Sequence, residues 1–325
     1  MKKYDLILYN GEEILELRLS LMYKYVDYFV IVEFDKTFQN KKKPYYFDIK
    51  KFNKFKKKII YKKYKVPHRF RKKSAWDVET YQRESLDKGI NIKDRDMIIL
   101  SDADEIIDPS KLKYKYNEIK RYELLNLRFY PNYLNLTSPF WLNPLSTSYN
   151  VAKEIGLEAL RASYRAVKPG DKYGIYRQYT KHRKNNIIKK AGWHFSSLRL
   201  NKNKSEIIKR KLNENSATQF INKVVFHTNM IDFKIKFGLD INTYGSPHLW
   251  GSVDKKIIKN KKVISWMENN NLFYKRRFNY IKPNYKNRFP YPSKFAIRVT
   301  ILINHIVYSL FYIQYIFKKL KFWKQ

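Results

Sequence analysis

The residues best suited to chemistry are three carboxylates that directly follow a short apolar run. The segment Ser101-Asp102-Ala103-Asp104-Glu105 comes after the stretch DMIIL at positions 96–100. If the chain stays extended here, Asp102 and Asp104 point to the same side. Two such hard oxygen donors can hold Mn²⁺ or Mg²⁺ and leave coordination positions for diphosphate oxygens. Because acidic turns are common, an Asp-x-Asp alone does not decide between a metal site and a solvated loop.

Two neighbouring carboxylates need separate interpretations. Glu105 has three open roles: it orients the first two carboxylates, acts as a general base, or is a solvated loop residue. Asp108 precedes Pro109 and Ser110, which is typical of a helix N-cap with proline at the first helical position. We therefore assign Asp108 to structure.

A second candidate is His194, in the segment Gly192-Trp193-His194-Phe195-Ser196. A histidine between two aromatic residues is more often a core residue than a ligand. The functional alternative makes it a metal or diphosphate partner that comes from the far half of the domain. The other five histidines show no ligand spacing, and the chain has no Walker loop, catalytic triad or paired-histidine zinc motif.

The elements that must position these residues follow an α/β pattern. Residues 4–9 and 28–34 are predicted strands, and residues 12–25 between them have helical apolar spacing. Strand, helix and strand in this order open a parallel sheet, and the apolar stretch at 96–100 adds a buried strand to it. Its carboxylates then lie at the carboxyl end of a strand, where open α/β sheets bind ligands. A helix is predicted over 74–86, with Ser74 as N-cap and Arg83 paired with Glu79.

The charge of the chain is its most unusual bulk property. Among 325 residues, 68 are Lys or Arg and 29 are Asp or Glu, a formal charge of +39. Such an excess attracts polyanions such as nucleic acid, an anionic membrane or phosphate-bearing substrates. An AT-rich genome also yields many lysines, and no zinc-finger or RNA-recognition pattern accompanies them. With no cysteine, disulfides and thiolate sites are excluded, and we expect an intracellular compartment.

The C-terminal end differs from the rest. Residues 299–317 contain no charged side chain, but polar residues interrupt them, and lysines follow at 318, 319, 321 and 324. This pattern is typical of a helix that lies on an anionic membrane surface. The alternative is a helix packed on its own domain. We predict a catalytic domain over 1–240 and an extension over 241–325, with a basic amphipathic helix at 295–325.

Taken together and in order, these segments resemble glycosyltransferase family 17, the family of the bisecting N-acetylglucosaminyltransferase of N-glycans. The resemblance covers about residues 3 to 235 and rests on a series of short segments. They are Glu16-Leu17-Arg18, Val26-Asp27, residues 29–33, Lys36-Thr37-Phe38, Lys43-Pro44, Tyr46-Phe47, Trp76, Gln82-Arg83, residues 102–106 and residues 192–196.

The resemblance implies a GT-A type α/β fold with a mixed, mainly parallel central sheet, followed here by a helical C-terminal tail. A nucleotide-sugar half to about residue 125 precedes an acceptor half over 126–240. It also implies an inverting transfer from UDP-N-acetylglucosamine or a similar UDP-sugar, with Mn²⁺ or Mg²⁺ as cofactor.

The resemblance also assigns roles to residues. Asp102, Asp104 and His194 become the expected metal and diphosphate ligands. Glu33 and Arg83 become donor-binding candidates, although a hydrogen-bonded structural role for Glu33 and a helical pairing with Glu79 for Arg83 stay open. Candidates for the general base, by residue type and region, are Glu105, Glu154 and Glu158.

Some features depart from the animal members of the family, which have an N-terminal anchor and act in the Golgi lumen. Here the first strand is expected at about residue 4, and there is no cysteine. These departures favour a bacterial or viral cytoplasmic enzyme, with peripheral attachment to the inner membrane face as an open alternative. The acceptor is then expected to be a surface-glycan precursor or a lipid-linked saccharide. The rival hypothesis is a non-catalytic basic protein that binds an anionic surface, with nucleic acid disfavoured.

Overall fold

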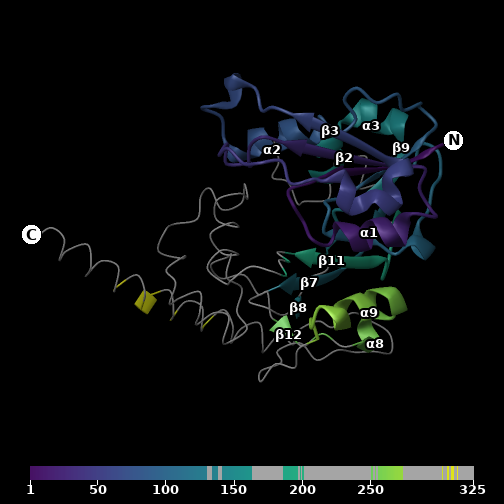
Figure 1. The fold of residues 1–325 in the computed structure, drawn as a ribbon, viewed down its shortest axis with the longest axis vertical. Coiled ribbons are helices and arrows are strands. Elements are labelled where there is room, and N and C mark those ends of the chain that lie inside the picture. Colours follow the sequence, from purple (N-terminus) through teal and green to yellow (C-terminus); the bar gives the residue numbers. More distant parts are fainter. Residues whose placement is uncertain are drawn as a thin grey trace, which may run out of the picture.

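Two β-sheets organise the part of the chain that the computed structural model describes (Figure 1). The described residues are 1–129, 134–137, 141–162, 186–196, 198, 200, 250–251, 253 and 255–273, together with 302, 306, 309, 310 and 313. Most of the predicted acceptor half and most of the predicted helix at 295–325 lie outside these residues.

The larger sheet has seven strands in the order β10-β6-β9-β4-β1-β2-β3. Its strands are β1 Lys3–Leu8, β2 Tyr28–Phe34, β3 Ile59–Tyr64, β4 Met97–Leu100, β6 Lys120–Tyr122, β9 Leu145–Ser148 and β10 Ile187–Ile188. Strands β3, β2, β1 and β4 run parallel, whereas β9 pairs antiparallel with both β4 and β6. The predicted mixed, mainly parallel α/β sheet is therefore confirmed.

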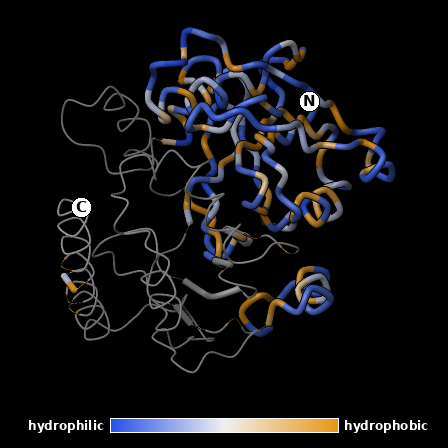
Figure 2. Tube along the Cα trace, turned by 60° about the vertical axis from the view of Figure 1, so that its left-hand side comes forward, coloured by the Kyte–Doolittle hydropathy of each residue, from blue (hydrophilic) through white to orange (hydrophobic). Residues whose placement is uncertain are grey.

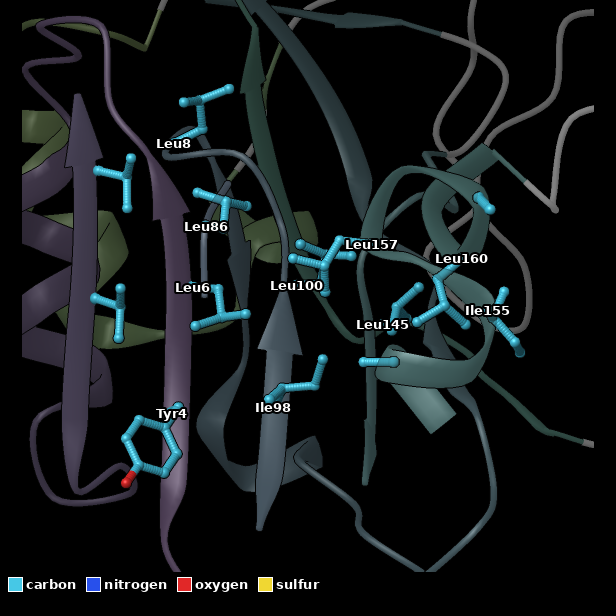
Figure 3. Packing of buried hydrophobic residues seen from close by; sticks show 14 of the residues in the cluster. Tyr4, Leu6, Leu8, Leu86, Ile98, Leu100, Leu145, Ile155, Leu157 and Leu160 are labelled. Atoms are coloured by element: carbon cyan, nitrogen blue, oxygen red, sulfur yellow. The ribbon is translucent and has the colours of Figure 1, made fainter. Parts of the chain in front are cut away.

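The apolar runs of β1, β2 and β4 explain why these strands lie at the centre of the sheet. Leu6 and Ile98 point to one face, whereas Ile7 and Ile99 point to the other, and each face has its own core cluster. In Figure 3, Leu100 of β4 lies next to Leu157 of α4 (Leu157–Ala162), and Leu145 and Leu160 continue the same cluster, with Leu6 on the neighbouring strand β1. Burial on both faces fixes the register of the strand that precedes the carboxylates.

The helices are short and several begin with a recognisable cap. They are α1 Leu15–Met22, α2 Ala75–Arg83, α3 Tyr149–Ile155, α4 Leu157–Ala162, α8 Lys255–Ile258 and α9 Lys261–Asn269, with 3₁₀ turns η1 Ile49–Lys58, η2 His68–Phe70 and η3 Pro109–Lys111. Ser74 and Asp77 form a capping box at the start of α2, and Asp108 caps η3, both at the predicted positions. Helix α2 is shorter than the predicted 74–86, because Ser85 and Leu86 bond three residues back.

The smaller sheet has the order β12-β8-β7-β11-β5 and receives the chain directly after the carboxylate loop. Its strands are β5 Glu105–Ile107, β7 Leu125–Phe129, β8 Leu134–Thr137, β11 Gly192–Ser196 and β12 Trp250–Gly251. Strand β11 pairs antiparallel with β5, so that His194 lies opposite Glu105. The loop 101–104 therefore connects the two sheets, with β4 on one side and β5 on the other.

Residues from beyond position 250 also contribute to the packed core. Val263 and Met267 of α9 share a buried cluster with Ile14 and Leu17 at the start of α1. The domain division at residue 240 stays a prediction, and the described part of the extension packs against the N-terminal region.

Candidate functional site

Arg18 of α1 binds the loop that carries Asp102 and Asp104 through several hydrogen bonds. Its guanidinium forms two hydrogen bonds with the Asp5 carboxylate, at 3.0 and 2.5 Å. The same group donates to the Asp102 carbonyl, to Ser101 Oγ at 2.7 Å and to the Glu105 carbonyl at 3.3 Å. Arg18 and Asp5 are both buried. Because a guanidinium has five donors in a fixed plane, this one side chain defines the path of the loop.

Asp102 lies between two arginines that come from different helices. Arg83 Nη1 of α2 lies 2.5 Å from its Oδ1, and Arg161 Nη2 of α4 lies 2.6 Å from its Oδ2. Although burial favours the neutral acid, Arg161 and Arg83 together hold the pKa of Asp102 well below its usual range. The carboxylate is thus ionised, and it keeps 30% of its side chain exposed.

Arg83 itself connects three elements. Its Nη2 lies 2.8 Å from Glu79 Oε1 within α2, and its Nε lies 2.8 Å from Glu158 Oε2 on α4. The contact with Glu158 is an ion pair rather than an aligned hydrogen bond. The predicted helical pairing of Arg83 with Glu79 is present, its contact with the carboxylate loop was not predicted, and its role in donor binding stays a prediction.

Helix α4 is fixed by a carboxylate from the end of α2. Glu84 accepts hydrogen bonds from the backbone N–H groups of Leu157 and Glu158, at 3.0 and 2.9 Å. Gly156 has φ +91°, and a Cβ there would lie 3.0 Å from Glu84 Oε1. The cap fixes the start of α4 and so places Arg161 one turn later, beside Asp102.

Glu105 is fully buried, and each of its two carboxylate oxygens accepts hydrogen bonds. Arg161 donates to it twice, at 2.8 and 2.5 Å, Trp141 donates through its indole N–H, and the Asp102 N–H donates at 2.8 Å. Burial is the largest single influence and raises the pKa of Glu105. The charge and hydrogen bonds of Arg161, together with the other groups around the carboxylate, lower this pKa more in sum, so the net direction is downward. Of the three roles left open by the sequence, the orienting role fits these contacts.

His194 and Asp104 face each other next to this network. Nε2 of His194 lies 3.7 Å from Oδ2 of Asp104, which is longer than a hydrogen bond. On the other side of the ring, Nδ1 lies 3.1 Å from Oδ1 of Asn126, and the Trp141 ring stacks on the imidazole at 4.4 Å. With Asn126 Oδ1 as the acceptor, this contact assigns the proton to Nδ1, and Nε2 is the atom turned toward Asp104.

The comparison with known protein families adds the deciding observation. A sequence model of glycosyltransferase family 17 matches residues 1–211. The chain belongs to glycosyltransferase family 17. A search of curated proteins finds no matching relative. The match includes every side chain described above, so this site belongs to the family 17 domain, and the mainly parallel sheet agrees with the GT-A type fold.

The predicted metal ligands do not converge as one group of three in the family 17 site. Among the described residues, no cluster of three or more His, Asp or Glu side chains is arranged to hold a metal ion. Asp104 and His194 form a pair with mixed oxygen and nitrogen donors, which suits Mn²⁺. Asp102 instead has each oxygen on an arginine.

Carboxylates outnumber guanidinium groups in the described part of the network. The described network contains three guanidinium groups and six carboxylates, an excess of three negative charges. They are Arg18, Arg83 and Arg161, with Asp5, Glu79, Asp102, Asp104, Glu105 and Glu158. The oxygen donor of Asp104 and the nitrogen donor of His194 are of types that bind divalent transition metals, so this pair fits such an ion by its donor chemistry.

Two predicted site residues lie apart from this network. Glu33 at the end of β2 is fully buried and accepts from the N–H groups of Tyr46 and Phe47, at 2.6 and 3.1 Å, and from the Tyr61 hydroxyl at 2.8 Å. These contacts fit the structural alternative, in which Glu33 fastens the segment after β2. Glu154 lies on the exposed side of α3.

Sequence reasoning missed four side chains of the site. They are Arg18 as the support of the loop, Asn126, Trp141 and Arg161. Arg18 stood within a segment that resembles the family, but its type alone did not indicate a role. The others come from segments whose proximity depends on the tertiary fold.

Proposed function

We propose that this family 17 glycosyltransferase transfers N-acetylglucosamine from UDP-N-acetylglucosamine to a glycan or a lipid-linked saccharide. The transfer proceeds with inversion at the anomeric carbon and is assisted by Mn²⁺ or Mg²⁺. The observation that carries the proposal is the convergence of Asp104 and His194 beside Asp102, at the carboxyl end of β4. Ligands of open α/β sheets bind at this end of the strands.

Asp104 and His194 would hold the divalent ion. The pairing of Nδ1 with Asn126 leaves Nε2 as the only ring nitrogen directed at Asp104. A neutral Nε2 would direct its lone pair at the Asp104 carboxylate, and a divalent cation bound by both atoms would make this arrangement favourable. The bound ion would neutralise negative charge on the diphosphate leaving group.

Asp102 has a different role in this proposal. Arg83 and Arg161 keep it ionised and restrict its orientation, while part of its side chain stays exposed. An ionised carboxylate is an acceptor only, so it suits hydroxyl groups of the donor nucleotide sugar. Glu105 and Glu158 hold the two arginines in place, and we assign them to positioning rather than to taking a proton from the acceptor.

The reaction itself would be a single displacement. The acceptor oxygen forms a bond to the anomeric carbon while the bond from that carbon to the diphosphate oxygen breaks, and UDP leaves with the electron pair. The acceptor proton passes to a base. The rigid network below the loop contributes by keeping the carboxylates in place without reorganisation during the reaction.

Release of UDP from a panel of UDP-sugars tests this function. The full chain is incubated with Mn²⁺ and UDP-N-acetylglucosamine, UDP-glucose or UDP-galactose, and UDP is quantified. We expect the fastest release from UDP-N-acetylglucosamine and a loss of about 100-fold in Asp104→Asn. Asp108→Asn is the matched control, since Asn caps η3 as well as Asp does. Equal release from all three sugars would reject the donor assignment.

The same assay separates the enzyme from the non-catalytic alternative. A protein that only binds an anionic surface would retain salt-dependent binding after loss of the carboxylates and would release no UDP. A family 17 enzyme of the proposed kind would lose UDP release in Asp104→Asn while its surface binding stays unchanged.

A further inference from the structure

The described part of the C-terminal segment presents an apolar stripe to solvent. Leu302, Ile306, Leu310 and Ile313 are helical and are 59%, 52%, 58% and 49% exposed. They are four, four and three residues apart, which is the spacing of one face of an α-helix. They make up half of the eight large hydrophobic residues that are exposed in the described part of the chain. In Figures 1 and 2 their positions are the coloured pieces near the C-terminus.

The sequence places polar groups away from this stripe. Asn304, Tyr308 and Tyr312 each follow a stripe residue by two positions. Two positions correspond to about 200° around an ideal α-helix, so the sequence pattern assigns polar residues to the side opposite the stripe. A helix with one aliphatic side and one polar side is amphipathic rather than uniformly apolar. In the described parts of the chain, no helix is both long and apolar enough to cross a bilayer.

Charge indicates which partner covers the stripe. From Asn269 to the last residue the sequence contains twelve Lys or Arg and no Asp or Glu. Four of those lysines lie within the last eight residues, directly after the stripe. Lysines next to an apolar helical face are attracted to anionic headgroups while the aliphatic side chains enter the acyl boundary. A second protein surface would need acidic groups of its own to match this charge.

We propose that the stripe Leu302, Ile306, Leu310 and Ile313 docks onto an anionic lipid bilayer and lies in its interface without spanning it. This attachment is independent of the proposed reaction, because the stripe contains no residue of the site. It places the enzyme next to acceptors that are themselves membrane-bound.

Vesicle co-sedimentation with the full-length protein tests the proposal. Vesicles of phosphatidylcholine alone are compared with vesicles containing 30% phosphatidylglycerol. The variant is Leu302→Asp/Leu310→Asp, and the matched control is Tyr116→Asp, which changes an exposed apolar residue away from the tail. Because the substituted side chains are exposed, the fold is expected to persist, and circular dichroism verifies it.

We expect the natural chain and Tyr116→Asp to bind the anionic vesicles, and the double variant to bind at least about tenfold more weakly. Equal sedimentation of the double variant and the natural chain would overturn the proposal. Failure of the natural chain to bind the anionic vesicles would also overturn the proposal. This holds if the chain instead dimerises through the stripe, as measured by light scattering, or if it binds duplex DNA.

Discussion

Asn126 Oδ1 lies 3.1 Å from Nδ1 of His194, and this contact determines which imidazole nitrogen faces Asp104. Both residues are buried on neighbouring parallel strands, β7 and β11, where they are register partners. The strand pairing therefore fixes the hydrogen bond. Orienting contacts of this kind determine how well a histidine binds a metal.

Removal of the Asn126 side chain is expected to weaken metal binding. Asn126→Ala should lower the affinity for Mn²⁺ by about 10- to 100-fold, because the imidazole loses its fixed tautomer and orientation. Asn126→Asp keeps an acceptor for Nδ1 and should retain most of the affinity. The free Mn²⁺ signal in electron paramagnetic resonance measures both. Asn143→Ala removes another buried amide and serves as the control. Equal weakening in all three variants would refute the orienting role.

Loss of Arg161 is expected to destabilise the fold strongly. Arg161→Ala leaves Glu105 buried with one fewer cation and should lower the free energy of unfolding by about 3–5 kcal/mol. Urea denaturation measures this change. Arg71→Ala, at an exposed position, should change it by less than about 0.5 kcal/mol. If the two variants are equally stable, the arginine network does not support the loop.

The stability of the protein should depend on pH through Asp102. The folded pKa of Asp102 lies below its unfolded value of about 3.9. Its stabilising contribution is therefore complete above about pH 5, begins to fall as the pH drops below the unfolded value, and is lost as the pH falls through the lower folded pKa. Asp102→Asn should thus be destabilising at pH 7 and less so at pH 3, measured by urea denaturation in EDTA. An equal difference at both pH values would contradict the ion-pair assignment.

Gly192 is expected to tolerate no side chain. A Cβ at this position would lie 2.1 Å from the Ile106 carbonyl oxygen, so β11 would have to move away from β5. Gly192→Ala should destabilise by more than about 3 kcal/mol and weaken Mn²⁺ binding, because His194 belongs to the same strand. Gly89 is the comparison, because its φ is also positive, at +70°, but the nearest atoms to an added Cβ there would be 3.9 Å away. Gly89→Ala should lower the free energy of unfolding by about 1 kcal/mol. Thermal unfolding of both variants measures the difference.

The sequence predicted those parts of the fold that depend on local pattern. Continuous apolar runs indicated β2 and β4, and the Ser74 cap indicated the start of α2. Strand β9 was not predicted, because Leu145-Ser146-Thr147-Ser148 has one apolar residue. It is buried only because it pairs with both β4 and β6.

The candidate site was predicted in its carboxylates, its histidine and Arg83, but not in Arg18 or Arg161. The acidic segment after β4 and the family resemblance indicated Asp102, Asp104 and His194. Arg161 comes from α4, whose position depends on the contact between Glu84 and the start of that helix. Asn126 alternates with apolar residues in a strand, where its side chain has no sequence signal. Neither contact follows from periodicity or spacing.

Calorimetric titration of UDP tests the central claim most directly. The full chain is titrated in Mn²⁺ and again in EDTA, alongside Asp104→Asn and the control Asp108→Asn. We predict that UDP binds in Mn²⁺ to the natural chain and to Asp108→Asn, and that binding disappears in EDTA and in Asp104→Asn. Equally tight UDP binding in EDTA would contradict a divalent ion held by Asp104 and His194.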